Sequence, residues 1–357
     1  MSDNDSLIDF VQSVAGEAHL KVEENLGDGF VRLRISEAER RQAKHDIRSV
    51  EDVVIELLRN SRDAHAGRIF VATGREGDLR TLVVVDDGTG VPTHLQEAIF
   101  EPRVTSKLET MVTDTWGVHG RGMALFSVRS NVVTARVASS DAHRGLALHI
   151  VTDTAELAER ADQSSWPAVE RGEDGQLAVA RGPHNIVRRI VEFALERPNL
   201  DVYFGSPAEI VATMHAVARD ELDTGDLLFN DDLAKLMVWQ RPTTAGDAAE
   251  LVSLSAGLGL EISERTAHRI LAGEIPPLRT VHASVTASAP SAVAAPNIYK
   301  DRRSLKIADG DLTAFSNALT AAFDDLADAY YIHLRGEPRI IVGRDEIKVR
   351  FTVDKEE

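Results

Sequence analysis

The chain has 357 residues, 43% of them apolar and only 5% aromatic, so it can form two or three packed units with mainly aliphatic cores. It contains no cysteine, which excludes disulfides and cysteine-ligated metal centres. The net charge of −17 argues against nucleic-acid binding over the whole surface, because phosphate neutralisation needs an excess of Lys and Arg. The N-terminus does not have the pattern of a signal peptide, and no segment approaches the roughly 18 apolar residues of a membrane span, so we expect a cytoplasmic protein.

Helical and strand-like segments alternate along the first part of the chain. Residues 1–46 combine a short helical pattern, the strand-like sequence FVRLRI and a charged stretch. Apolar runs then predict strands over 70–73, 81–85, 131–138 and 146–152. The run at 81–85, TLVVV, is typical of a strand buried on both faces. Residues 207–272 have the apolar spacing of helices.

The last part of the chain predicts further elements. Residues 284–296, SVTASAPSAVAAP, indicate a strand that runs into a linker or long loop. A helix is predicted over 311–329, followed by strands over 330–336, 338–343 and 347–353. No internal repeat is visible. These elements together predict an α+β protein.

The first candidate site element is a helix that starts near residue 49. Ser49 and Asp52 form a capping-box pattern at its beginning. Glu56, Asn60 and Asp63 are spaced i, i+4 and i+7, so they share one face, next to a stripe of Val and Leu. On an arbitrary helix such a polar face is usually only solvated, so this pattern needs support from elsewhere in the chain.

The second candidate element follows the apolar strand at 81–85. The sequence VDDGTG places Asp86 at the end of this strand and glycines at positions 88 and 90. A carboxylate there can accept a hydrogen bond from the exocyclic amine of a ligand, and glycines allow close approach of the backbone. An ordinary tight turn would account for Asp87 and Gly88 alone, but not for the whole string.

The third candidate element is a glycine-rich loop before a predicted helix. Gly117, Gly120 and Gly122 lead into the helical sequence MALFSVRSN, and such loops direct backbone N–H groups at an anion. A packing loop is an equally good explanation when this pattern stands alone. Residues 99–115, which precede it, are polar and long enough for a mobile lid, from which Lys107 can reach a terminal phosphate.

These elements, in this order, resemble the GHKL superfamily of ATPases. The family includes type IIB topoisomerase B subunits, MutL proteins, gyrase B, a heat-shock chaperone family and sensor histidine kinases. ELLRNSRDA at 56–64 matches the family's helix motif, VDDGTG at 85–90 matches its first glycine box, and RVTSK with GVHGRGMALFSV is similar to its lid and second glycine box. The resemblance covers residues 47–200 and is nearest to MutL and the topoisomerase B subunits.

The resemblance implies a Mg-ATP site with assigned residues. Glu56 is expected to be the general base for the attacking water, Asn60 to ligate Mg²⁺, Asp63 to support the site wall and Asp86 to accept the adenine amino group. The remaining expected nucleotide-binding residues, which make room for the nucleotide or hold its phosphates, are Gly88, Gly90, Lys107, Gly117, Gly120, Arg121 and Gly122.

The resemblance also implies an architecture. An N-terminal segment, 1–46, is expected to swap onto a second subunit. It precedes a GHKL α/β sandwich at 47–205, whose mixed sheet is covered on one face by helices. A helical region at 206–278, similar to the helix–two-turns–helix insert of topoisomerase B subunits, and a small transducer-like α/β domain at 279–357 complete the chain. In that last domain, Arg344 or Lys348 takes the place of the switch lysine, or the switch is absent.

Two features leave alternatives open. His45 begins a sequence that is similar to a histidine-kinase phosphoacceptor box, but Glu56 follows only eleven residues later, which leaves no room for a separate phosphoacceptor hairpin. The helix pair within 248–274 is also similar to a DNA-binding helix-turn-helix, in which Arg265, His268 and Arg269 would face DNA. Two packed helices without a DNA role explain that pair equally well, given the acidic chain.

The function that the resemblance implies is a slow, ATP-gated dimerising ATPase with a DNA-processing protein partner, in the manner of the topoisomerase B and MutL branch. The alternatives are an ATP-sensing scaffold with little hydrolysis, a chaperone-like clamp and a histidine-kinase-type ATPase domain. DNA contact is left open, and no membrane association is expected.

Overall fold

The computed structural model describes residues 22–106, 112–114, 117–119, 122–172, 175–222, 233–288, 309–330, 332–336, 338–342 and 347–355. The chain divides into two compact units, residues 1–289 and 290–357. In the described part of the chain, no helix has both the length and the apolar character that crossing a bilayer requires.

A five-stranded mixed sheet forms the centre of the first unit. Its strands, in spatial order, are β12 (Asp201–Gly205), β3 (Arg68–Glu76), β4 (Leu79–Asp86), β9 (Leu146–Asp153) and β8 (Thr134–Ser140). β12 and β3 are parallel, whereas the other neighbours are antiparallel. The strands predicted at 70–73, 81–85, 131–138 and 146–152 are thus confirmed.

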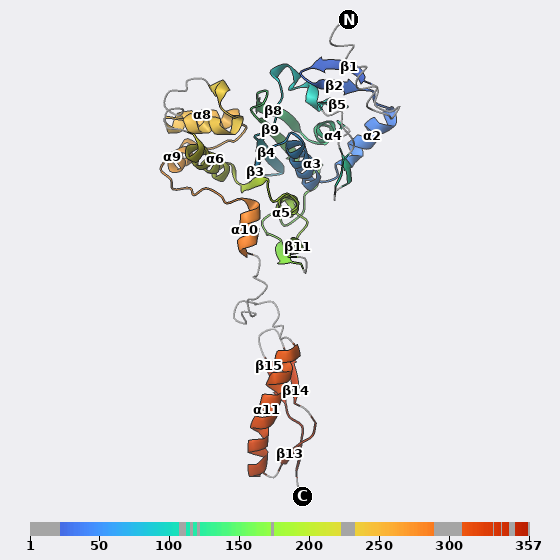
Figure 1. Ribbon diagram of the computed structural model, residues 1–357, viewed down its shortest axis with the longest axis vertical. Coiled ribbons are helices and arrows are strands. Elements are labelled where there is room, and N and C mark those ends of the chain that lie inside the picture. Colours follow the sequence, from blue (N-terminus) through green and yellow to red (C-terminus); the bar gives the residue numbers. More distant parts are fainter. Residues whose placement is uncertain are drawn as a thin grey trace. The chain divides into compact units, whose positions relative to one another are not determined.

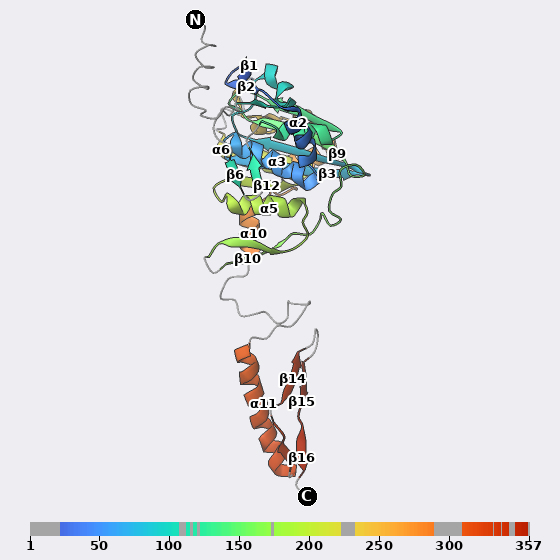
Figure 2. The same ribbon diagram turned by 90° about the vertical axis from the view of Figure 1, so that its right-hand side faces the viewer.

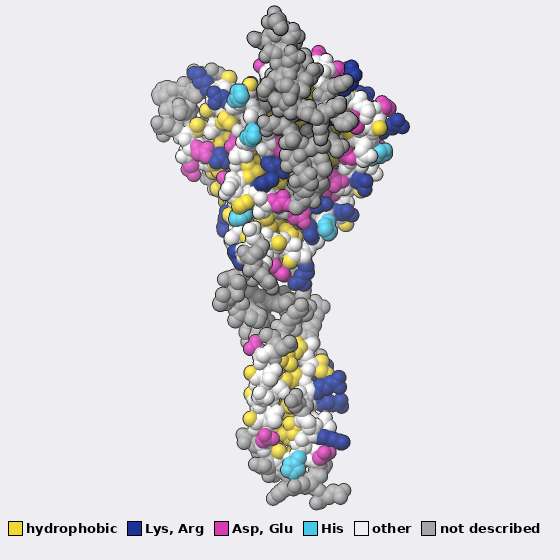
Figure 3. Space-filling view, turned by 45° about the vertical axis from the view of Figure 1, so that its right-hand side comes forward, with side chains coloured by type: hydrophobic (Ala, Val, Ile, Leu, Met, Phe, Trp, Pro, Cys, Tyr) yellow, Lys and Arg dark blue, Asp and Glu magenta, His cyan; other side chains and the backbone are white. Residues whose placement is uncertain are grey.

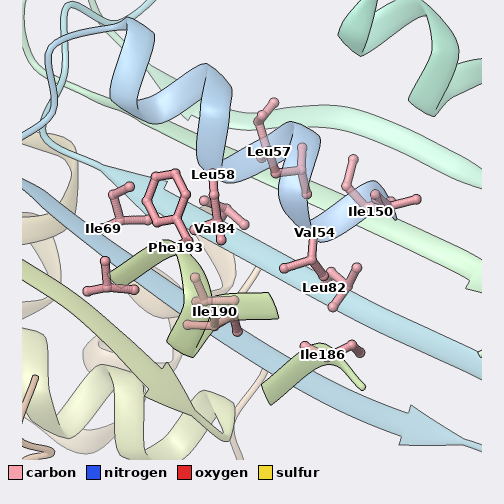
Figure 4. Packing of buried hydrophobic residues seen from close by; sticks show 14 of the residues in the cluster. Val54, Leu57, Leu58, Ile69, Leu82, Val84, Ile150, Ile186, Ile190 and Phe193 are labelled. Carbon is pink, nitrogen blue, oxygen red and sulfur yellow. The ribbon is translucent and has the colours of Figure 1, made fainter. Parts of the chain in front are cut away.

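One face of the sheet carries the larger apolar core. The helices on this face are α3 (Val50–Asp63), α4 (Ala124–Asn131), α5 (Ile186–Glu196) and α10 (Val281–Ser288). At the start of α3, the backbone N–H of Ser49 donates to the Asp52 carboxylate at 3.0 Å, as a capping box requires. Figure 4 shows Val54 and Leu58 of α3 lying between strand residues and α5, so the apolar stripe fixes how this helix sits.

A second set of helices covers the opposite face of the same sheet, as the ribbon in Figure 1 shows. It consists of α6 (Pro207–Glu221), η4 (Val238–Thr244), α8 (Ala248–Gly257) and α9 (Glu264–Leu271). Trp239 of η4 is buried, and its ring centroid lies 5.3 Å from that of Phe70 on β3. The helical region predicted over 207–272 is therefore part of the packing around the sheet.

Within residues 47–205 the helices lie on one face of the sheet, as expected, but the helices of residues 206–278 cover the opposite face, a placement that was not predicted for them. Leu82 and Val84 of β4 belong to the first core, and Val83 and Val85 belong to the second. Because successive side chains of a strand point to opposite faces, an unbroken apolar run needs cover on both.

Helices α8 and α9 form the predicted helix pair. Ser263 accepts the backbone N–H of Thr266 at 3.2 Å and so caps α9. Ala267 and Ile270 are buried in the second core, whereas Arg265, His268 and Arg269 are exposed. Packing on the sheet therefore accounts for the apolar positions of α9, and a DNA role for its basic positions stays a prediction.

The strand expected within residues 284–296 is wrong in its described part, which belongs to helix α10. Val281 and Val285, one helical turn apart, are both buried in the first core. The backbone N–H of Ala283 donates to the Thr280 hydroxyl at 3.2 Å, which starts the helix. Burial of one stripe thus outweighs the strand preference of the valines. α10 and α5 contact the hairpin of β10 (Ala168–Arg171) and β11 (Leu177–Arg181), which is visible in Figure 2.

Smaller elements border the sheet of the first unit. β1 (Val22–Gly27), β2 (Phe30–Leu33) and β5 (Val104–Thr105) form a separate three-stranded sheet. The other short elements are α2 (Glu37–Asp46), η1 (Thr93–Leu95), η2 (Ala98–Phe100), β6 (Val112–Asp114), β7 (Gly117–His119) and η3 (Leu233–Lys235). Residues 22–46, expected to be part of a segment that swaps onto a second subunit, contact the rest of their own chain through β5 and α4.

The second unit contains the helix and strands predicted for the C-terminal part. They are α11 (Asp309–Tyr330), β13 (Ile332–Leu334), β14 (Arg339–Val342), β15 (Ile347–Arg350) and β16 (Val353–Lys355), with β13 paired to β16 and β14 to β15. Phe323 stacks on Phe351 with ring centroids 4.9 Å apart. Lys348 is exposed on β15, and Arg344 lies outside the described residues. Figure 3 shows hydrophobic side chains on the surface of this unit, and Leu326 is 50% exposed.

The contact between β9 and the turn after α8 gives a stability prediction. Gly259 has φ +79°, and a Cβ on it would lie 2.9 Å from the ring of His149. We expect Gly259→Ala to lower the free energy of unfolding by about 1–3 kcal/mol, because it adds both backbone strain and a clash. Gly257→Ala is the matched control, since nothing lies within 4 Å of its Cβ position, and it should be neutral or stabilising. Urea titrations measure both, and equal effects would contradict the packing described.

His149 also makes stability depend on pH. Burial, assisted by Arg136, lowers the pKa of His149 below its usual value, although Glu261 acts in the opposite direction. The unfolded chain then binds more protons than the folded one as the pH falls through the unfolded value of about 6.5. The free energy of unfolding should therefore be highest above that pH and decrease below it. His149→Gln should weaken this dependence, His268→Gln on the exposed face of α9 should not, and identical pH profiles for both would refute the assignment.

Candidate functional site

A cavity of about 580 Å³ lies beside α3, on the side away from its apolar stripe. Its walls come from segments within residues 28–30, 56–65, 89–92, 99–106, 122–125 and 142–146. The volume is within the range of about 300–1,000 Å³ that is typical of small-molecule sites. Segments far apart in the sequence thus meet around one space that can hold a nucleotide-sized ligand.

The polar face of α3 forms one wall of this cavity. Glu56, Asn60 and Asp63 all line it, as their spacing predicts, because the apolar stripe on the neighbouring face is held against the sheet. The carboxylate of Glu56 forms an ion pair with Arg59 at 2.7 Å, and Arg59 is itself only 5% exposed. The position of Glu56 is therefore set by a partner on the next turn of its own helix.

Asn60 has an unusual environment. Its amide nitrogen Nδ2 is buried and has no hydrogen-bond partner among the described residues. Leaving a buried donor unpaired costs about 1–3 kcal/mol, so such groups are uncommon unless a ligand completes them. An amide donor in this state fits an acceptor such as a phosphate oxygen, whereas Oδ1 of the same carboxamide is the atom that could ligate a metal ion.

Asp86 lies at the end of β4, directly behind the cavity wall, and is 2% exposed. The Ser61 hydroxyl on α3 donates to its Oδ2 at 2.7 Å, and the backbone N–H of Gly88 donates to its Oδ1 at 2.9 Å. Asp86 and Gly88 are not lining residues themselves, but their neighbours Ala64 and Thr89 are. These two hydrogen bonds thus hold the carboxylate in a fixed position behind the cavity wall.

Close packing requires glycine at positions 88 and 90 of the first glycine box, in addition to the expected role in nucleotide binding. A Cβ on Gly88 would lie 2.7 Å from the carbonyl oxygen of Ala64. Gly90, which lines the cavity, has φ +64°, and a Cβ there would lie 2.1 Å from the carbonyl oxygen of Asp141. Larger residues at these positions would therefore push the turn away from α3 or from the loop before β9.

The lid and the second glycine box are described in part. Gly122 lines the cavity with φ +65°, and its Cβ position lies 3.1 Å from the carbonyl oxygen of Val104. Gly117 begins β7, which pairs with β6. Lys107, Gly120 and Arg121, all expected at the phosphates, lie outside the described residues.

Several lining residues have no counterpart in the motifs. Asp28, Gly29 and Phe30 come from the turn between β1 and β2, and His65 and His143 come from turns on either side of the cavity. Both histidines adopt left-handed backbone conformations, with φ of 59° and 61°. No local pattern marks these residues, since each reaches the cavity only through tertiary packing. His45, in the last turn of α2, does not line it.

Comparison with known proteins agrees with this geometry. Residues 45–162 match the family of histidine kinase-, DNA gyrase B- and HSP90-like ATPases. The chain carries a GHKL ATPase domain. The matched region contains α3, the turn after β4, and the cavity walls from Glu56 to Leu146, but not the turn at residues 28–30.

Individual relatives are DNA mismatch repair proteins. The chain is 42% identical over 84 residues to MutL of Thermus thermophilus and 43% identical over 82 residues to MutL of Thermus aquaticus, which is 23% of this chain in each case. It is 39% identical over 94 residues, 26% of this chain, to MutL of a Chelativorans species. The matches span only 14–15% of the length of these relatives, so the similarity is to a part of their ATPase region.

The bond between Ser61 and Asp86 can be tested directly. Ser61→Ala should lower the free energy of unfolding by about 1.5–3 kcal/mol, because it removes a buried hydrogen bond to a carboxylate. Ser127→Ala is the control, since this equally buried hydroxyl donates only to a carbonyl of its own helix, Met123, at 2.9 Å. Thermal and urea unfolding would measure the difference. If both variants lower the free energy of unfolding equally, the bond to Asp86 contributes no more stability than an ordinary buried hydrogen bond within a helix.

Proposed function

We propose that the chain binds ATP with Mg²⁺ in this cavity, hydrolyses it slowly, and acts as an ATP-gated dimerising switch for a DNA-processing protein. The observation that carries the ATP site is the polar face of α3, which lines a cavity of nucleotide size within a GHKL ATPase domain and includes the Asn60 amide, a buried donor with no partner among the described residues. The likeness to part of MutL supports the choice of partner class.

Each residue of the site has a distinct task in this proposal. Asn60 holds the metal, which, when bound, neutralises charge on the phosphates. Glu56 takes a proton from the attacking water, four residues before Asn60 and therefore one turn away on the same wall. The Asp86 carboxylate accepts a hydrogen bond from the exocyclic amino group of adenine, and Lys107 with the loop from Gly117 to Gly122 holds the phosphates.

A second candidate function, an ATP sensor with little hydrolysis, is favoured by one feature. The Glu56 carboxylate is already engaged by Arg59 at 2.7 Å. A general base must present a lone pair to water, so this ion pair has to loosen for rapid turnover. The two functions share the binding site and differ only in the rate of phosphate release.

Replacement of Glu56 distinguishes binding from hydrolysis. We expect Glu56→Ala to retain Mg-ATP binding and to slow phosphate release about 100-fold or more, because a general base contributes that much. Glu37→Gln, at an exposed position on α2 outside the cavity, is the control and should behave as the wild type. If the wild type itself releases no phosphate above background while binding ATP, the sensor function is correct and the enzyme function is not.

Replacement of Asn60 separates a ligand-binding role from a structural one. Because its buried amide donor has no partner in the part of the chain that the structure describes, we expect Asn60→Ala to leave the free energy of unfolding within about 1 kcal/mol of the wild type. Affinity for Mg-ATP should fall at least about tenfold, measured by titration calorimetry. Asn131→Ala is the control and should lower the free energy of unfolding without changing the affinity for Mg-ATP. Its Nδ2 donates to the carbonyl of Ser127 at 2.8 Å, and Asn131 does not line the cavity. An Asn60→Ala protein that is unstable but binds normally would refute the proposed role.

A further inference from the structure

The turn between β1 and β2 forms part of the cavity wall although it lies outside the region that matches the ATPase family. Asp28, Gly29 and Phe30 all line the cavity. The three turn residues from Gly27 to Gly29 have positive φ, 84°, 49° and 80°, so the hairpin folds back tightly and projects its tip. Phe30, the first residue after the turn, is half-buried and packs against the first core.

The same hairpin is bonded to the strand that leads into the lid. Val31 and Arg32 of β2 pair with Thr105 and Val104 of β5, and the backbone N–H of Leu33 donates to the carbonyl of Arg103 at 3.0 Å. In turn, the Arg103 N–H donates to the carbonyl of Gly122 at 2.8 Å. β5 is therefore held between the hairpin and the second glycine box.

Ion pairs reinforce this connection. Arg32 pairs with Glu24 across the hairpin and with Glu101 just before β5. Arg103 pairs with Glu39 on α2, where a backbone hydrogen bond from Ser36, with help from the Arg103 charge, lowers the pKa of Glu39. At its tip the hairpin also reaches η1, since the Asp28 carboxylate lies 3.6 Å from the His94 imidazole. The hairpin thus contacts two other segments of the chain, β5 through β2 and η1 through its tip.

We propose that the β1–β2 hairpin is a cover for the nucleotide cavity, contributed by the same chain, and that Phe30 contacts the bound nucleotide. This inference rests on the proposed function, since it assumes that the cavity is the ATP site. The aromatic ring of Phe30 supplies flat apolar surface to the nucleoside part of the ligand, beside other apolar lining residues such as Ile99 and Leu125. A ligand in the cavity packs against the hairpin tip. Because β2 is paired with β5, ordering of the hairpin by the ligand also orders β5.

The test compares two truncations in the hairpin of the full-length protein. Leu26 and Phe30 both pack partly against the first core, but only Phe30 lines the cavity. We expect Phe30→Ala to weaken Mg-ATP binding about tenfold, mainly through faster dissociation, as loss of an aromatic contact to a base does. Leu26→Ala should change the affinity by no more than about twofold. Equal affinities for Phe30→Ala and the wild type, or equal losses in the two variants, would overturn the proposal.

A measurement on the unmutated protein tests the proposal even if the variants do not fold. Hydrogen–deuterium exchange with and without Mg-ATP should show slower exchange in residues 22–33 and 104–105 together with α3. Slower exchange in α3 and residues 86–90 alone would leave the ATP site intact and refute the cover. Absence of any Mg-ATP binding by the wild type would instead remove the proposed function itself, and the cover with it.

Discussion

The buried carboxylate of Asp86 holds together the three elements that shape the cavity. It ends the central strand β4, accepts the Ser61 hydroxyl from α3, and accepts the backbone N–H of Gly88 from the turn that follows. A charge with so little exposure needs these donors, since burying an unpaired carboxylate is very costly. As a result, helix, strand and turn keep fixed relative positions, and the polar residues of α3 face a preformed space.

The two apolar cores make the first unit a three-layer structure, with the sheet between two layers of helices. α3 is pressed onto the sheet by one core, and the second layer of helices covers the strands from behind. The chemistry therefore sits on the one side of α3 that neither core uses. Because the stripe and the polar face belong to the same helix, a change that shifts the packing of Leu57 or Leu58 also moves Glu56 and Asn60.

Local sequence patterns predicted the elements of the site well. The spacing of Glu56, Asn60 and Asp63 and the position of Asp86 at a strand end follow from helix and strand periodicity, which depends only on neighbours in the chain. The same periodicity predicted cover on both faces, since Leu82 and Val84 point to one face of the strand and Val83 and Val85 to the other. The family likeness indicated helices on one face for residues 47–205, and the helices that cover the other face come from the region that follows.

Contacts between distant segments could not be predicted in this way. Phe30 and His143 reach the cavity through tertiary packing, and nothing in their immediate sequence indicates it. α10 was misjudged for a related reason, since the burial of Val281 and Val285 against α5 is decided by a partner almost a hundred residues earlier. Glu56 illustrates the intermediate case: its place on the wall was predictable, but its ion pair with Arg59 required the folded side chains.

The central claim is that α3 and the turn after β4 together hold Mg-ATP. The most direct measurement is a crystal structure of the full chain with a non-hydrolysable ATP analogue and magnesium. We expect the metal ion at the Asn60 carboxamide, the adenine amino group at Asp86, and Phe30 in contact with the nucleoside. Nucleotide bound at another surface, or in this cavity without any contact to Asn60 and Asp86, would contradict it.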